Sequence, residues 1–243
     1  MYLTTAVRLN GNMALAEAGI CNYFYSGNLP AFYKEVETYL AQMKDAGAEA
    51  TILFIHWGVE YGLSVTAEQQ NIAQALCNLG IDVIIGGHPH VVQTVDLLSS
   101  DIDPAHKTVC LYSTGNAVSN QRQGKLSSIT TAHTEDGVMF FVTFEKYSDG
   151  TVYLAGANVL PTWVNMRRNS AGRTEYNILP LDVEQLEQWP QMFQLDESTF
   201  SATKRSYERT MNIVGAGLER TQVYLSEEKQ DREDAYWQQK ALP

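Results

Sequence analysis

Ile81-Asp82-Val83-Ile84-Ile85-Gly86-Gly87-His88-Pro89-His90 is the stretch that decides the fold of this chain. Its apolar run is typical of a strand buried on both faces of a parallel sheet. Ligands of open α/β sheets bind outside the carboxyl ends of the strands, and imidazole is the commonest protein ligand for transition metals. The stretch therefore predicts a parallel strand that presents His88 and His90 to a metal ion. The alternative is a glycine-containing turn with two exposed histidines.

The residues before this stretch complete a β-α-β unit. Residues 50–56 form a second apolar, β-branched run that ends in His56. Between the two runs, residues 66–79 repeat apolar residues at helical spacing, with a capping-box pair at Thr66 and Gln69. A strand, a helix and a strand of this length place both strand ends on one edge of a parallel sheet. We therefore expect His56 to lie near His88 and His90.

The rest of the chain predicts an α/β fold whose later strands are mostly antiparallel. A helix is predicted over 31–45, and residues 121–134 are predicted to form a surface loop. Further strands are predicted over 91–98, 108–112, 137–146 and 151–163, with Ser148-Asp149-Gly150 as a hairpin turn. Helical spacing returns after Asp182, so we expect one domain over 1–181 and a helical extension over 182–243.

Composition excludes several classes of partner. The net charge of −11 over 243 residues argues against nucleic acid, since phosphate binding needs a basic face. Arg167, Arg168 and Arg173 form the one evident basic cluster, which we interpret as a solvated loop. No apolar window is long enough to span a bilayer, so the chain is expected to be soluble as given. Leu15 to Cys21 superficially resembles a lipoprotein signal, but Ile20 stands where a small residue is needed.

Three cysteines and two further histidines carry no chemistry in this interpretation. Cys21, Cys77 and Cys110 have neither a paired nor a metal-type spacing and are predicted to be structural thiols. His106 and His133 lack supporting context and are expected at the surface.

Polar residues near the strand ends are the other site candidates. Glu60 could orient a metal-bound imidazole, donate a proton to a leaving group as a catalytic acid, or simply solvate its loop. Trp57 is a candidate substrate platform or a packing residue. Asn116 could bind a ligand oxyanion, fix a metal ligand or belong to an ordinary turn.

Three motifs together resemble a known family. They are His56-Trp57-Gly58-x-Glu60-Tyr61, Gly87-His88-Pro89-His90-Val91-Val92-Gln93 and Tyr112-Ser113-x-Gly115-Asn116. Their order and spacing are similar to those of the bacterial poly-γ-glutamate capsule biosynthesis family, within the calcineurin-like metallophosphoesterase superfamily. The resemblance covers about Tyr33 to Leu181 and implies a layered α/β/β/α fold at the bacterial cell surface.

The resemblance also implies a site with two divalent metal ions. By motif position His56, His88 and His90 correspond to metal ligands, and we assign Trp57, Gln93 and Asn116 to the substrate, an anionic polymer or phosphoester. Such metals polarise a phosphoryl oxygen and activate a water.

The acidic motifs of the superfamily are not found before His56. The chain lacks the Asp-x-His, Gly-Asp and Asn-His motifs, and no histidine follows Gly11-Asn12. Three neutral imidazoles cannot neutralise two dications. We therefore predict that this chain alone binds metal weakly, with a single ion, and hydrolyses little or nothing. A sheet short of strands would expose apolar surface, which makes a homodimer plausible.

Three hypotheses follow. The first is that the chain is the C-terminal part of a metal-dependent phosphoesterase-like protein of capsule biosynthesis. The second is a non-catalytic polymer-binding or assembly module on the same scaffold. The third is an independent mononuclear zinc hydrolase, which lacks a convincing general base.

Overall fold

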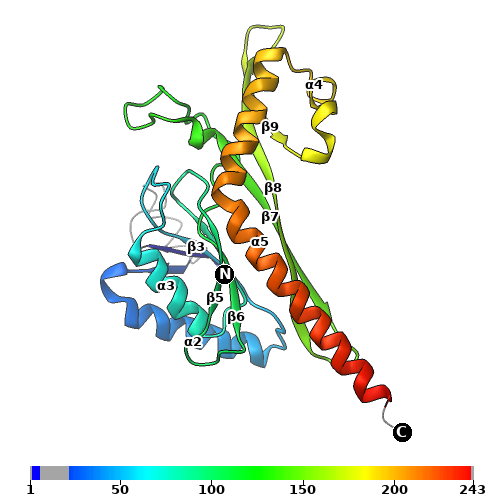
Figure 1. Cartoon of the computed structure of the whole chain (residues 1–243). Helices are drawn as coiled ribbons and strands as arrows, with labels where there is room; N and C mark the ends of the chain where they lie inside the picture. Colours follow the sequence, from blue (N-terminus) through cyan, green and yellow to red (C-terminus); the bar gives the residue numbers. More distant parts are fainter. Residues whose placement is uncertain (1, 6–21, 242–243) are drawn as a thin grey trace.

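The structure is a computed structural model that describes residues 2–5 and 22–241 (Figure 1). Its elements are β1 (Tyr2–Thr5), β2 (Asn22–Phe24), η2 (Ser26–Asn28), α2 (Leu29–Asp45), β3 (Ile52–His56), α3 (Ala67–Asn78), β4 (Val83–Gly87), β5 (Val95–Ser99), β6 (Lys107–Leu111), η3 (Ala132–Glu135), β7 (Asp136–Lys146), β8 (Val152–Arg168), β9 (Thr174–Pro180), η4 (Val183–Gln188), α4 (Trp189–Met192) and α5 (Glu197–Ala241).

A six-stranded sheet has the order β2-β1-β3-β4-β6-β5, and only β5 runs antiparallel to its neighbour. The predicted β-α-β unit is confirmed as β3-α3-β4, with His56 opposite Gly87 in the register. The capping box is also confirmed, because Gln69 N donates to Thr66 Oγ1 and Thr66 N donates to Gln69 Oε1. This unit sets both histidine-bearing strand ends on one edge.

Helices α2 and α3 cover one face of this sheet. Every second residue of β3 points toward them, so Leu53 and Ile55 are buried in the same core as Ile72 and Leu76 of α3. Cys110 is fully buried beneath the same layer, and burial raises the pKa of its thiol well above the usual value. Cys77 is buried too, and neither cysteine forms a disulfide, as expected of structural thiols. Cys21 lies outside the described residues.

A second, antiparallel sheet of three strands, β7-β8-β9, packs on the other face of the first sheet. Alternate residues such as Phe140 and Val159 point inward, and the residues between them, including Met139, face outward. The predicted antiparallel half is thus confirmed, but β9 was not predicted and β8 extends five residues beyond 163. The arginine cluster was expected to form a solvated loop, but Arg167 and Arg168 are the last two residues of the longer β8.

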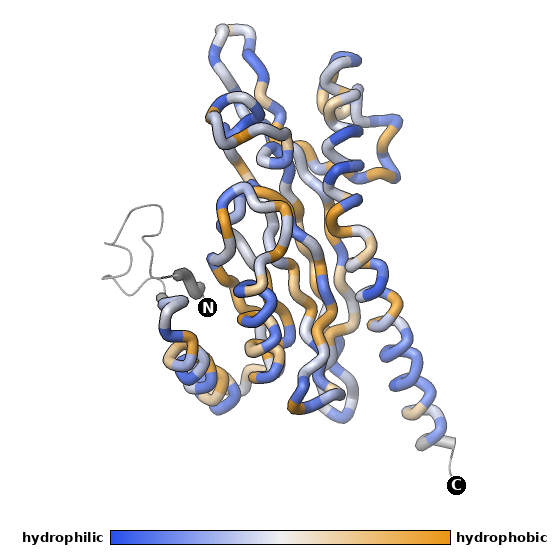
Figure 2. The backbone as a smooth tube through the Cα atoms, turned by 60° about the vertical axis from the view of Figure 1, so that its left-hand side comes forward, coloured by the Kyte–Doolittle hydropathy of each residue, from blue (hydrophilic) through white to orange (hydrophobic). Residues whose placement is uncertain are grey.

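Helix α5 runs beside β8 along the length of the molecule and crosses β5 (Figure 1). Its buried residues Val214, Leu218 and Leu225 join the core between the two sheets. Gly217 makes the crossing possible, because a side chain there would overlap the carbonyl oxygen of Val95. The last turns of α5 are mostly polar (Figure 2), so the expected helical extension is present. A domain boundary at residue 181 stays a prediction.

No helix in residues 2–5 and 22–241 is long and apolar enough to cross a membrane. The lipoprotein-like segment Leu15 to Cys21 and the pair Gly11-Asn12 lie outside these ranges.

Candidate functional site

The three predicted imidazoles lie at one edge of the six-stranded sheet. His56 is the last residue of β3, and His88 and His90 follow the end of β4. The ring centroids of His56 and His88 are 4.4 Å apart, and those of His88 and His90 are 6.3 Å apart. This edge, formed by His56, His88, His90 and the loops around them, is called the histidine edge below.

The backbone at the histidine edge is strained. His88 has φ 103° and His90 has φ 59°, and both values lie in the left-handed region that non-glycine residues rarely adopt. Tyr61, on the facing loop, has φ 63°, and its N–H donates to the Pro89 carbonyl at 2.7 Å. Strain of this kind costs energy and concentrates at functional sites. Packing and hydrogen bonds therefore hold the two histidines in an orientation that the local chain does not prefer.

Two residues assigned to substrate are buried beneath the edge. Trp57 is 2% exposed, stacks on Tyr112 and donates from Nε1 to the Tyr112 carbonyl at 2.9 Å. Gln93 is fully buried and donates from Nε2 to the carbonyls of Gly62 and Ser64. In this structure neither side chain faces solvent. Both instead fasten the loop after β3, so we assign them a positioning part rather than a substrate contact.

Asn116 fixes the orientation of His90. Its Nδ2 donates to the Thr134 carbonyl at 2.9 Å and to the His90 carbonyl at 3.1 Å, so Oδ1 must face the ring. Oδ1 lies 2.9 Å from Nδ1 of His90 and can only accept, so Nδ1 carries the proton. In the neutral ring the lone pair is then on Nε2. Such a hydrogen bond is the usual support of a metal-ligating histidine.

The electrostatics of the edge keep two rings neutral. Burial lowers the pKa of His56 to about 4, with a further contribution from His88 and His90. Burial also lowers the pKa of His88. Glu60 is exposed, and its carboxylate opposes both shifts, so it lies close enough to influence both rings. At neutral pH both imidazoles can therefore offer a lone pair.

These nitrogen donors can supply the imidazole ligands of a divalent metal site, but not its negatively charged ligands. Neutral imidazoles suit zinc and similar ions, and a structural or catalytic site normally needs three or four protein ligands. Among residues 2–5 and 22–241, no three histidine, cysteine, aspartate or glutamate side chains are grouped to hold an ion. The edge thus presents nitrogen donors without a bridging carboxylate.

Some residues of the edge were not singled out from the sequence. Gln121 accepts from Asn116 Nδ2 at 3.1 Å and donates to the hydroxyl of Tyr61 at 3.2 Å, which links the two loops over His90. Gln121 belongs to a polar stretch without periodicity, so no sequence signal distinguishes it from its neighbours. Gln69 is fully buried and donates to Gln93 at 2.9 Å, although the sequence indicated only its capping role.

The other two histidines lie away from the edge and are partly buried rather than fully at the surface. His106 precedes β6, and its Nε2 lies 3.1 Å from the Ile81 carbonyl. His133 lies in η3, with Nδ1 2.9 Å from the Thr131 hydroxyl.

Comparison with known proteins agrees with the motifs. Residues 6–121 match the family described as Bacterial capsule synthesis protein PGA_cap. The chain is 33% identical over 97 residues to "PGA biosynthesis protein CapA" of Bacillus subtilis (strain 168), covering 39% of this chain and 23% of that protein. It is 33% identical over 95 residues to "Capsule biosynthesis protein CapA" of Bacillus anthracis, covering 38% and 21%. The matched region therefore spans less than a quarter of either relative.

Proposed function

We propose, from the match of residues 6–121 to the bacterial capsule synthesis family, that the histidine edge is the imidazole part of a divalent-metal site acting on a phosphoester or anionic polymer. The observation that carries the proposal is the position of the three histidines at one edge, where the His88 ring lies 4.4 Å from that of His56 and 6.3 Å from that of His90, with the rings of His56 and His88 held neutral by burial. The names of the two relatives, which refer to PGA and capsule biosynthesis, support a capsule polymer as the substrate, and we propose the bacterial cell surface as the place of action.

In this proposal each residue has a defined part. His56 and His88 offer neutral nitrogens, and Asn116 directs Nε2 of His90 away from its own amide. Glu60, exposed beside the rings, can orient an imidazole or donate a proton to a leaving group. A divalent ion, when bound, would polarise a phosphoryl oxygen and neutralise developing charge.

The donor set limits what this chain does alone. Imidazoles bring no negative charge, so a second dication at the edge would be repelled by the first. We propose that one ion binds weakly, that the chain alone hydrolyses little, and that carboxylate ligands outside the described residues complete the site in the active protein.

Calorimetric titration of ZnCl2 into the full chain at pH 7.5 tests the proposal. We expect one weak site in the wild-type chain, and loss of that site in His88→Ala. His133→Ala is the matched control, because this histidine lies in η3 and bonds Thr131 instead. Two tight sites, or zinc binding that survives His88→Ala, would contradict the assignment.

A second candidate function is a non-catalytic polymer-binding or assembly module. The absence of a complete ligand group among the described residues favours it. Because this chain alone is proposed to hydrolyse little, the metal dependence of polymer binding separates the two candidates. Polymer binding that needs added zinc and is lost in His56→Ala supports the metal site, and polymer binding that is unchanged by a chelator and by His56→Ala supports the module.

A homodimer remains part of the proposal. Met139 and Phe141, on the outward face of β7, are 47% and 51% exposed, and apolar edge strands promote association. Light scattering across a dilution series tests this, and a monomer at all concentrations would exclude it.

A further inference from the structure

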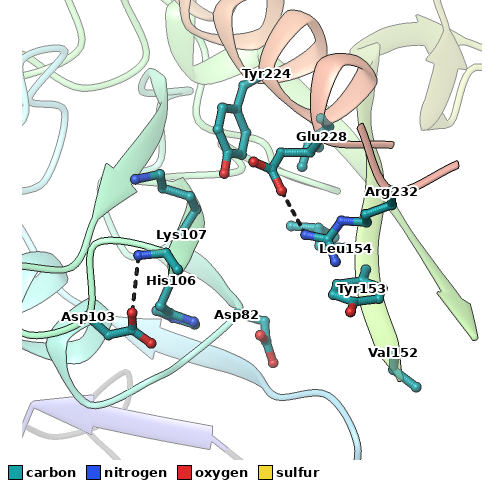
Figure 3. Close-up of a pocket in the computed structure, with 12 residues that line it drawn as sticks. Asp82, Asp103, His106, Lys107, Val152, Tyr153, Leu154, Tyr224, Glu228 and Arg232 are labelled. Carbon is teal, nitrogen blue, oxygen red and sulfur yellow. Dashed lines mark hydrogen bonds and ion pairs between the residues drawn. The ribbon is translucent and has the colours of Figure 1, made fainter. Parts of the chain in front are cut away.

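A cavity of about 330 Å³ lies at the edge of the six-stranded sheet opposite the histidine edge. Asp82, just before β4, and Lys107, the first residue of β6, mark the amino ends of the parallel strands. The far wall comes from β8 and from α5, which contributes Tyr224, Glu228 and Arg232 (Figure 3). Nothing in the proposed function uses this cavity.

Two cations in the cavity retain unused hydrogen-bond donors. Lys107 Nζ donates to the Pro104 carbonyl at 2.7 Å and lies 5.9 Å from the ring centre of Tyr224. Arg232 donates to Glu228 at 2.8 Å, and its guanidinium lies over the ring of Tyr153. A lysine carries three donors and an arginine five. The hydrogen bonds of the described chain therefore leave donors from both residues for a ligand.

Acceptors remain on the sheet side of the same cavity. Asp82 accepts from the backbone N–H and hydroxyl of Thr51, both through Oδ2. Asp103 accepts from the Ala105 N–H through Oδ1. The Nε2 atom of His106 lies 3.1 Å from the Ile81 carbonyl and must donate to it, so the neutral form of this ring has its lone pair on Nδ1. Within the described residues, one oxygen of each carboxylate and this nitrogen stay available.

This mixture of charges matches a neutral ligand better than a simple ion. An anion would meet the carboxylates of Asp82, Asp103 and Glu228 in a chain of net charge −11, and a cation would meet Lys107 and the Arg232 that pairs with Glu228. A neutral hydroxyl both donates and accepts, so a ring with several hydroxyl groups can pair with both sets at once. Val152, Leu154 and Leu225 supply apolar surface for the carbon face of such a ring. From this pairing we infer that the cavity binds a saccharide unit.

A second cavity of about 700 Å³ adjoins the first. The two share Tyr153 and Arg232, and the second is lined further by Tyr147, Ser148 and Thr151 at the β7–β8 turn. Aromatic rings and hydroxyl groups make up most of the lining of this second cavity. The adjoining space extends the site from one sugar unit to a short oligosaccharide.

Saturation-transfer NMR on the full chain tests the inference. The probes are N-acetylglucosamine, glucose and their β-1,4-linked dimers, with methyl phosphate and free glutamate as charged comparisons. We expect a saturable signal from at least one sugar and a stronger one from its dimer. Lys107→Met should weaken sugar binding about tenfold, the usual loss for a hydrogen bond to a charged group. Lys125→Met, on an exposed loop, is the matched control and should bind as the wild type does.

Three outcomes with the wild-type and Lys107→Met chains would overturn the inference. They are no saturable sugar signal, binding of glutamate or methyl phosphate in place of sugars, and equal binding by the Lys107→Met chain. His88→Ala separates this site from the histidine edge, because it should abolish zinc binding and leave sugar binding unchanged. A sugar signal lost in His88→Ala would place the ligand at the histidine edge and likewise overturn the assignment.

Discussion

Replacement of Arg209 by methionine should destabilise the protein strongly, because it leaves a buried carboxylate without its cation. Asp136, the first residue of β7, is 2% exposed. Arg209 of α5 donates to it twice, from Nε at 2.9 Å and from Nη2 at 2.7 Å, and Ser206 donates at 2.6 Å. Burial raises the pKa of Asp136 even though Arg209 and Ser206 oppose that shift.

The expected cost follows from this geometry. Removing one partner of a buried pair costs about 3–5 kcal/mol, and the partly exposed Arg209 side chain argues for about 3. For a chain of this length that loss lowers the melting temperature by roughly 6–12 °C. Since protonation relieves a lone buried carboxylate, the loss should shrink as the pH falls from 7 toward 4.

Thermal unfolding followed by circular dichroism at pH 7 and pH 5 measures both effects. The double variant Asp136→Asn with Arg209→Met should recover part of the loss, because no charge then stays buried. Arg220→Met is the matched control, since that arginine of α5 is exposed and lies 3.9 Å from Asp96. A loss below about 1 kcal/mol in Arg209→Met, or the same loss in Arg220→Met, would refute the reasoning.

Three further predictions concern the histidine edge. Gly86→Ala should cost at least about 3 kcal/mol in urea unfolding, because its Cβ would overlap the Tyr112 carbonyl, whereas Gly87→Ala meets no atom within 4 Å and should be nearly neutral. The pKa of His56 is about 4 in the folded protein and 6.5 in the unfolded chain, so the unfolded chain takes up a proton first as the pH falls. The free energy of unfolding should therefore decrease between pH 6.5 and pH 4, by at most about 3 kcal/mol. His56→Asn should flatten this part of the curve of stability against pH. Asn116→Leu should weaken zinc binding about tenfold in calorimetry, and an unchanged affinity would remove Asn116 from the support of His90.

The sequence was sufficient to predict the helices and strands in which the spacing of apolar residues agrees with the start and stop signals at the ends. The run 81–85 reads as a buried strand, and the helix between Thr66 and Gly80 has both a capping box and a glycine stop. Because parallel strands joined by one helix must end on the same edge, the meeting of His56 with His88 followed from chain direction alone.

What could not be predicted depends on partners far away in sequence. Strand β9 alternates Glu175, Asn177 and other polar residues with apolar ones, and only pairing with β8 distinguishes it from a loop. The buried position of Gln93, which we had assigned to the substrate, could not be predicted for the same reason. Its amide is satisfied by Gly62 and Ser64, some thirty residues earlier, and no local pattern reveals that contact.

The C-terminal helix is joined to the histidine edge by three consecutive contacts. Arg209 of α5 holds Asp136, the Asp136 carbonyl accepts from the Asn116 N–H at 3.2 Å, and Asn116 orients His90. Because each contact is a hydrogen bond between buried or partly buried groups, displacement of α5 should release Asn116 before it disturbs β3 or β4. Zinc affinity in Arg209→Met should therefore fall by more than unfolding at the assay temperature explains. Affinity that merely follows the folded fraction would show that α5 supports the fold without orienting His90.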